Sequence, residues 1–190
     1  MAEVVRAHAR RNYEQLLTSA REAFAEHGTE ASLRDVARRA GVGIGTLYRH
    51  FPTREALLEA LLRSRFDALQ ERAGGLLGAA SARDGLLVWL GELAVGSTTY
   101  RGLPESVMTA LRDETSQLHA SCAAMRAAGA ALLRRAQEAG EVRADVTADQ
   151  LLALAAGLAW AGERLPGPAA TVEHLLAVVM DGLATGERHP

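Results

Sequence analysis

The chain has 190 residues, a formal net charge of −2 at pH 7 and only 4% aromatic residues, and all 21 of its basic residues are arginine. Its longest apolar run, residues 151–162, is shorter than the roughly 20 residues that span a bilayer, and its single cysteine, Cys122, excludes an intrachain disulfide. We find no secretory signal, so we expect a cytoplasmic protein with no membrane partner.

The charge is distributed unevenly along the chain. Residues 1–65 hold 11 arginines and 8 acidic residues, a net charge of +3, whereas residues 66–190 hold 10 arginines and 15 acidic residues, a net charge of −5. A basic segment within an acidic protein favours nucleic-acid binding by that segment, although an ordinary solvated surface also carries such a charge.

Strong helix formers dominate the sequence and long alternating strand patterns are absent, which predicts an all-α fold of about nine helices. An apolar stripe over residues 13–24 predicts the first helix, which should end near Gly28. We expect the first eleven residues to form a frayed tail.

Residues 32–51 have the pattern of two short helices joined by a glycine turn. Ser32 and Asp35 form a helix start signal, and Gly41 supplies the left-handed residue that ends the first helix. The second helix stops before Pro52, which cannot continue it. Its free face carries Ile44, Thr46, Tyr48, Arg49 and His50. Such a face suits phosphate oxygens and base edges better than it suits solvent, so the segment is expected to read DNA.

The sequence of residues 41–58, GVGIGTLYRHFPTREALL, resembles the helix-turn-helix of the tetracycline-repressor (TetR) family of bacterial transcriptional regulators. The resemblance runs from about residue 10 to about residue 62. Family members often carry serine or threonine where this chain has Gly43, so a side-chain cap is missing at the start of the recognition helix. The glycine of the family at position 45 is kept, where a missing side chain lets the backbone approach DNA closely.

The resemblance implies which residues contact double-stranded DNA. We expect these to be Ser32, Arg34, Gly43, Ile44, Gly45, Thr46, Tyr48, Arg49, His50 and Arg54. Hydroxyl, imidazole and guanidinium groups among them suit phosphates, assisted by helix N-termini. Arg49 and Ile44 are expected at base edges, with Arg34 as a weaker candidate.

The domains expected from the resemblance are a three-helix DNA-binding domain of residues 1–53, a connecting helix at about residues 54–73, and a C-terminal ligand-binding and dimerisation domain of residues 74–190. Thr53 should cap the connecting helix, which Gly74 and Gly75 should end. Five further helices are predicted at about residues 81–95, 105–111, 115–139, 147–163 and 172–183.

A ligand pocket in the C-terminal domain is the second site that the resemblance implies. Its candidate residues are Phe66, Trp89, Leu93, Tyr100, Met108, Leu111, His119, Cys122, Met125 and Trp160. Each of them, taken alone, fits an ordinary apolar core better than a ligand contact. His119 and Cys122 stand three residues apart and could bind a metal or sense oxidants. No third ligand is evident nearby, so we expect no metal and no cofactor.

The last two predicted helices are unusually apolar, which suggests that one face packs on the domain and another on a partner. Family resemblance favours a homodimer through a four-helix bundle, although helices buried within the monomer remain an alternative. The expected interface residues are Leu151, Leu154, Leu158, Val172, Leu175, Leu176, Val179 and Leu183. A two-fold dimer would present two recognition helices to a palindromic operator.

The sequence therefore predicts a repressor that binds a palindromic operator as a homodimer and is released by an unknown small-molecule effector. A ligand-independent or activating regulator, and a redox or metal sensor built on Cys122 and His119, are the alternatives. We find no nucleophile-elbow, phosphate-loop, dinucleotide-binding or zinc-protease motif, so we do not expect an enzyme.

Overall fold

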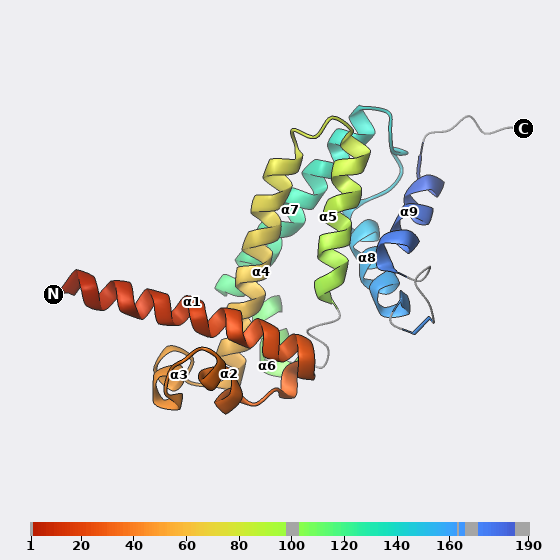
Figure 1. Ribbon diagram of the computed structural model, residues 1–190. Helices are drawn as coiled ribbons and strands as arrows, with labels where there is room; N and C mark the ends of the chain where they lie inside the picture. Colours follow the sequence, from red (N-terminus) through yellow and green to blue (C-terminus); the bar gives the residue numbers. More distant parts are fainter. Residues whose placement is uncertain (1, 98–102, 163, 166–170, 185–190) are drawn as a thin grey trace, which may run out of the picture. The chain divides into compact units, whose positions relative to one another are not determined.

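The structure is a computed structural model, and it describes residues 2–97, 103–162, 164–165 and 171–184. These residues form nine α-helices and one turn of 3₁₀ helix, and no β-strand occurs among them (Figure 1). The all-α fold predicted from the sequence is confirmed. Within the described ranges, no helix combines the length and the hydropathy that crossing a membrane requires.

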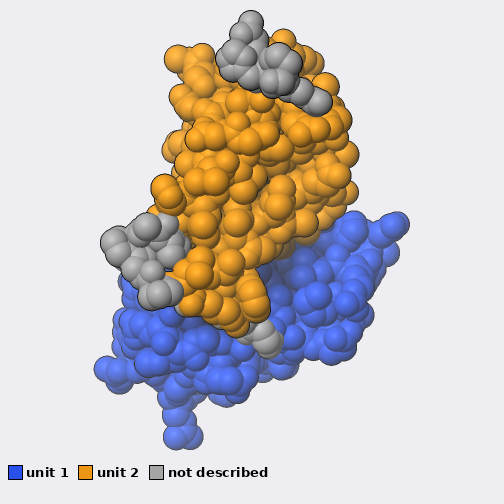
Figure 2. Space-filling view, turned by 90° about the vertical axis from the view of Figure 1, so that its right-hand side faces the viewer, with its two compact units in different colours: residues 1–65, 99–120 blue, residues 66–98, 121–190 orange. Residues whose placement is uncertain are grey.

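Two compact units divide the chain (Figure 2). The first unit consists of residues 1–65 and 99–120, and the second of residues 66–98 and 121–190. The sequence analysis instead placed everything beyond residue 74 in one C-terminal domain. The structure differs because the segment that leads into residue 120 returns to the first unit, where Arg63 donates a hydrogen bond to the side-chain oxygen of Gln117.

The first unit contains α1 (Ala2–His27), α2 (Leu33–Arg39), α3 (Ile44–His50), the start of α4 (Arg54–Leu76), α6 (Glu105–Arg112) and the start of α7 (Gln117–Glu138). In this unit α1 packs across α2, and α2 packs against α3 (Figure 1). The largest side chains of its core are completely buried: Leu16, Phe24, Leu47, Leu57, Leu58 and Leu61.

Two helices are longer than predicted. The expected frayed tail is helical from Ala2, because it contains neither glycine nor proline and Arg10 Nε donates to Glu14 Oε1 at 2.9 Å, one turn later. Similarly, α4 passes through Gly74 and Gly75 and ends at Leu76. Each glycine disfavours a helix by only about 1 kcal/mol relative to alanine. Leu76, the residue after the two glycines, packs against the apolar core, which favours continuing the helix to this point.

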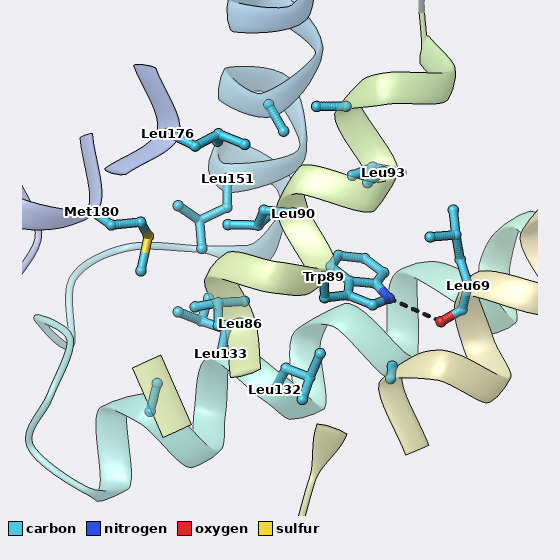
Figure 3. Close-up of a cluster of buried hydrophobic side chains, with 14 of the residues drawn as sticks. Leu69, Leu86, Trp89, Leu90, Leu93, Leu132, Leu133, Leu151, Leu176 and Met180 are labelled. Atoms are coloured by element: carbon cyan, nitrogen blue, oxygen red, sulfur yellow. Dashed lines mark hydrogen bonds between the residues drawn. The ribbon is translucent and has the colours of Figure 1, made fainter. Parts of the chain in front are cut away.

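The second unit contains the end of α4, then α5 (Ala82–Ser97), the rest of α7, α8 (Ala148–Gly162) and α9 (Val172–Gly182). In this unit α5 packs against both α8 and α9, which also pack against each other. Figure 3 shows the resulting core, which includes Leu86, Trp89, Leu90, Leu132, Leu151, Leu176 and Met180.

Helix starts are fixed by short polar caps at the positions that the sequence predicted. Thr53 Oγ1 accepts the N–H of Ala56 at 3.1 Å, and Ser81 Oγ accepts the N–H of Asp84 at 3.0 Å. Thr147 and Gln150 form a reciprocal capping box at the start of α8, with N···O distances of 2.9 and 3.3 Å. Each cap satisfies a backbone donor that the first helical turn leaves without a partner.

Candidate DNA interface and effector site

Residues 32–51 form a helix, a glycine turn and a second helix, as the sequence predicted. Gly41 has a φ of +68°, in the left-handed region that favours glycine. Its N–H donates to the carbonyl of Arg38 at 3.1 Å, and the N–H of Val42 donates to that of Ala37 at 3.0 Å. These bonds close α2 and direct the chain into α3, whose inner face is anchored by the fully buried Leu47.

The opposite face of α3 is open to solvent. Tyr48 is 49% exposed, Arg49 is exposed, and Ile44 and Thr46 are half-exposed in its first turn. A tyrosine ring and a guanidinium group standing in water on the same short helix have hydrogen-bond donors free for an external acceptor. The arrangement can therefore supply contacts to phosphate oxygens and to base edges.

The glycines at the start of α3 serve no packing need of the protein itself. A Cβ atom added at Gly43 or Gly45 would meet no other atom within 4 Å. Gly43 is the N-cap and offers no side-chain acceptor to the first turn of α3. The bare backbone at this point leaves the N–H groups of the helix start accessible to an anion such as a phosphate.

Two of the motif's arginines are engaged within the first unit. Arg39 donates from Nε to Asp35 Oδ2 at 2.7 Å and, through its two Nη atoms, to both carboxylate oxygens of Glu26 at 2.8 and 2.6 Å. Arg38 also pairs with Asp35. The hydrogen bond from Arg39 lowers the pKa of Glu26, and those from Arg38 and Arg39 lower the pKa of Asp35. Arg39 thus fastens α2 to α1, a role that the sequence analysis missed.

Arg34 and Arg49, in contrast, are exposed and have no hydrogen bond or ion pair with any described residue. Arg54 is only partly engaged in hydrogen bonds within the unit. Its Nη1 donates to the carbonyls of Thr29 and Ala31 at 2.7 Å each. It holds the segment before α2 against the start of α4, so a phosphate contact from Arg54 must come from its other nitrogens. That contact stays a prediction.

His50 ends α3 inside a cluster of three rings. Its ring centroid lies 6.0 Å from that of Tyr13 on α1 and 6.3 Å from that of Phe51, while Tyr13 and Phe51 are 5.1 Å apart. Such separations are typical of favourable aromatic pairs. The imidazole is half-buried, so the cluster fixes its orientation relative to the exposed face of α3.

The residues predicted for a ligand pocket are divided between the two units. Those in or against the core of the second unit are Phe66, Trp89, Leu93, Cys122 and Met125. Those in the first unit are Met108, Leu111 and His119. Tyr100 lies outside the described residues. Trp160 is 55% exposed, with the guanidinium of Arg164 3.9 Å from its ring centroid, so the expectation that it faces the interior is wrong.

The surroundings of Trp89 are filled by protein. The indole is 1% exposed and its Nε1 donates to the carbonyl of Leu69 at 2.9 Å (Figure 3). On α7, Gly129 lies so close that an added Cβ would be 2.4 Å from Trp89 Cη2. The absent side chain at Gly129 therefore makes room for the indole rather than for a ligand.

The sensor alternative receives little support from the local chemistry. Burial raises the pKa of the Cys122 thiol, which disfavours the reactive thiolate. Nδ1 of His119 lies 2.9 Å from the carbonyl of Leu111, so this nitrogen is engaged locally. The described residues contain no group of three metal-ligating side chains.

The residues predicted for a dimer interface divide by exposure. Leu151 and Leu176 are 3% and 2% exposed and belong to the core of the second unit, so a partner cannot reach them. Leu154 is 41% exposed, and Val178, which the sequence analysis did not single out, is 58% exposed. The remaining five are half-buried: Leu158, Val172, Leu175, Val179 and Leu183.

An apolar groove accompanies this face. Its volume is about 580 Å³, and it runs along α8, where Leu154 and Leu158 line it, with Leu183, the residue after α9, at its edge. Besides this groove along α8, the exposed side chains of Leu154 and Val178 leave apolar surface on the last two helices that none of the described residues covers.

Two family models match the sequence. Residues 16–61 match bacterial regulatory proteins of the tetR family, and residues 81–185, more than half of the chain, match the C-terminal domain of SbtR-like transcriptional regulators. The first match contains the whole helix-turn-helix, and the second contains α5 to α9.

Similar proteins extend over almost the whole chain. The TetR transcriptional regulator SCO0520 from Streptomyces coelicolor is 34% identical, with a TM-score of 0.72 over 92% of this chain and 99% of that one. A TetR transcription regulatory protein from Mycobacterium vanbaalenii is 32% identical, with a TM-score of 0.66 over 95% and 99%. The HTH-type transcriptional repressor KstR2 of Rhodococcus jostii (strain RHA1) is 27% identical over 90% of each chain. The chain therefore belongs to the TetR family and is a DNA-binding transcriptional regulator.

Proposed function

We propose that this protein is a repressor that binds a palindromic operator as a homodimer and releases it when an apolar small molecule binds the second unit. The exposed face of α3, with Tyr48, Arg49 and the bare backbone at Gly43 and Gly45, is the observation that carries the proposal. Repression is supported over activation because the similar KstR2 is named a repressor.

Arg49 and Ile44 are the proposed base readers, with Arg34 as a weaker candidate, and Tyr48 and Thr46 are proposed phosphate contacts. The seven residues of α3 span about 10 Å at 1.5 Å per residue, and the major groove is about 12 Å wide. A guanidinium group suits the two acceptors of a guanine in that groove, whereas hydroxyl groups suit phosphates.

The apolar face of α8 and α9 is the proposed dimer interface. Leu154 and Val178 stand in water on the isolated protomer, and burying such side chains stabilises by about 25 cal/mol per Å². A two-fold pair would place two α3 helices about one turn of DNA apart, or a multiple of it, which is why we propose a palindromic operator.

The proposed effector site is a groove between α5 and α9, because the space around Trp89 is already filled. Its volume of about 530 Å³ lies in the range of roughly 300–1,000 Å³ typical of small-molecule sites. Leu87, Val88 and Leu176 contribute to its apolar lining. At this groove, Arg72 Nε on α4 donates to Glu92 Oε1 on α5 at 2.8 Å. A ligand in the groove would therefore lie beside an ion pair that joins α5 to α4, the helix that begins directly after the helix-turn-helix.

The DNA claim is tested by selecting duplexes from a random pool and measuring the affinity of the selected duplex at several salt concentrations. Each phosphate contact should contribute about −0.9 to the slope of log K against log salt. Arg49→Ala should weaken discrimination at one base position by about 1–3 kcal/mol. The matched control, Arg134→Ala, removes an exposed arginine of α7 in the second unit and should change nothing. A flat salt dependence, or an unchanged preferred sequence in Arg49→Ala, would contradict the proposal.

A reporter gene placed behind the selected operator separates repression from activation. Expression should fall when the protein is present and recover when an apolar effector is added. Increased expression would instead support the activating alternative, and repression that no ligand relieves would support the ligand-independent one.

A further inference from the structure

A polar cleft lies in the first unit, beside the end of the recognition helix. Its volume of about 410 Å³ is within the range of roughly 300–1,000 Å³ seen for ligand sites. The lining comes from α1, from the end of α3 with the residue after it, from α4 and from the start of α7. Tyr13 and His50 contribute rings to one wall, and α4 contributes Glu59 and Arg63.

Glu59 and Arg63 carry opposite charges and stand four residues apart on α4, the spacing at which helical ion pairs usually form. They do not pair here. In the described part of the chain Glu59 has no hydrogen bond or ion pair, and Arg63 donates only to the neutral side chain of Gln117. Both side chains are half-buried at the cleft, where a charge without a counter-charge is less well stabilised than in bulk water.

We propose that this cleft binds a small zwitterion, a molecule of amino-acid size with a carboxylate, an ammonium group and an apolar side chain. The guanidinium of Arg63 suits a carboxylate, which it can bind through two parallel hydrogen bonds. The carboxylate of Glu59 suits the ammonium group. The apolar part would lie against Phe51 and Leu118, which also line the cleft.

Ligands with a single charge satisfy less of the site. An anion would leave Glu59 unpaired and add a second negative charge beside it. A simple cation would leave Arg63 with its neutral partner and place two positive charges together. Only a ligand with both charges neutralises both residues, and it does so without changing the net charge of the cleft.

The position of the cleft gives such a ligand a direct route to the DNA-binding surface. His50 lines the cleft and also ends α3. This inference does not rest on repression, because binding to the cleft is measured without DNA.

Calorimetric titration of the full chain with L-leucine tests the proposal, with two matched probes beside it. 3-Methylbutan-1-amine is leucine without its carboxylate, and 4-methylpentanoate is leucine without its ammonium group. We expect L-leucine to bind with a dissociation constant of about 1 mM or tighter, and each single-charge probe to bind at least about tenfold more weakly.

Two variants test which side chain binds each charged group of the ligand. Arg63→Gln should abolish the preference for L-leucine over the amine, and Glu59→Gln should abolish the preference over 4-methylpentanoate. Glu71→Gln, an exposed site later on α4, is the control and should leave both preferences intact. Each preference is the ratio of two affinities measured with the same folded variant. A general loss of stability would weaken both ligands alike and would leave this ratio unchanged.

Three outcomes overturn the proposal. The first is no heat of binding from L-leucine or L-phenylalanine at about 10 mM with protein that still binds duplex DNA. The second is equal affinity for L-leucine and for either single-charge probe. The third is binding that both Arg63→Gln and Glu59→Gln leave unchanged, which would place the ligand elsewhere.

Discussion

Replacing Gly129 by alanine tests whether the region around Trp89 is filled core or open pocket. An added Cβ would lie 2.4, 2.6 and 3.2 Å from three carbons of the Trp89 ring. Alanine in a helix interior is favoured over glycine by about 1 kcal/mol, so in an open space the variant would be more stable. In a filled core the overlap must be relieved by moving the indole or α7, which typically costs about 1–3 kcal/mol.

The indole has little freedom to move. It is 1% exposed, and a swing away from Gly129 strains or breaks the 2.9 Å hydrogen bond from Nε1 to the carbonyl of Leu69. A buried donor left without a partner costs about 1–3 kcal/mol. The two costs together are about 2–6 kcal/mol and exceed the gain of about 1 kcal/mol in helix propensity. Gly129→Ala should therefore lower the free energy of unfolding by about 1–5 kcal/mol.

Urea unfolding followed by circular dichroism measures this change, with Gly91→Ala as the matched control. Gly91 lies within α5, the helix that carries Trp89, but a Cβ there would meet nothing within 4 Å, so this variant should be as stable as the parent or slightly more so. In a Trp160→Phe background Trp89 is the remaining tryptophan, and its fluorescence should become more accessible to acrylamide in Gly129→Ala. Equal stability of the two alanine variants would refute the filled core and restore the predicted pocket at Trp89.

Local hydrogen bonding made much of the fold predictable. The caps at Ser32, Thr53, Ser81 and Thr147 join atoms only three residues apart, so their sequence patterns contain nearly all the information that the structure uses. Gly41 is similar, because its positive φ is a property of one residue. The helix-turn-helix and the exposed face of α3 could therefore be placed from sequence alone.

Contacts between distant residues could not be predicted in the same way. Arg39 reaches Glu26 across 13 positions, and nothing in either local pattern distinguishes this pair from two solvated side chains. Trp89 and Gly129 meet although 40 positions separate them. The prediction that Trp160 is buried was wrong for a related reason. Alanine and leucine make up much of α8, so its apolar pattern does not indicate which face of the helix packs against the core.

The same geometry yields two further predictions. The pKa of Glu26 is lowered in the folded state by its hydrogen bond from Arg39, so its contribution to stability is complete above the ordinary value of 4.5 and is lost as the pH falls through the lowered pKa. Glu26→Gln should therefore flatten the acid limb of a stability-against-pH curve, whereas Glu22→Gln, an exposed site on α1 without a partner among the described residues, should leave it as steep as in the parent. The second prediction concerns the dimer. A glutamate at Leu154 or Val178 is solvated in a free protomer, since these positions are 41% and 58% exposed, but it would be buried without a counter-charge in the proposed interface, which is costly. Leu154→Glu and Val178→Glu should thus sediment as folded monomers with weakened operator binding, and Val88→Glu, at a 44% exposed position of α5, should remain dimeric. Leu176→Glu cannot serve as this test, because Leu176 is 2% exposed in the core and its loss of dimer would only report unfolding. Dimers that persist in both Leu154→Glu and Val178→Glu would show that the interface lies elsewhere on the protein.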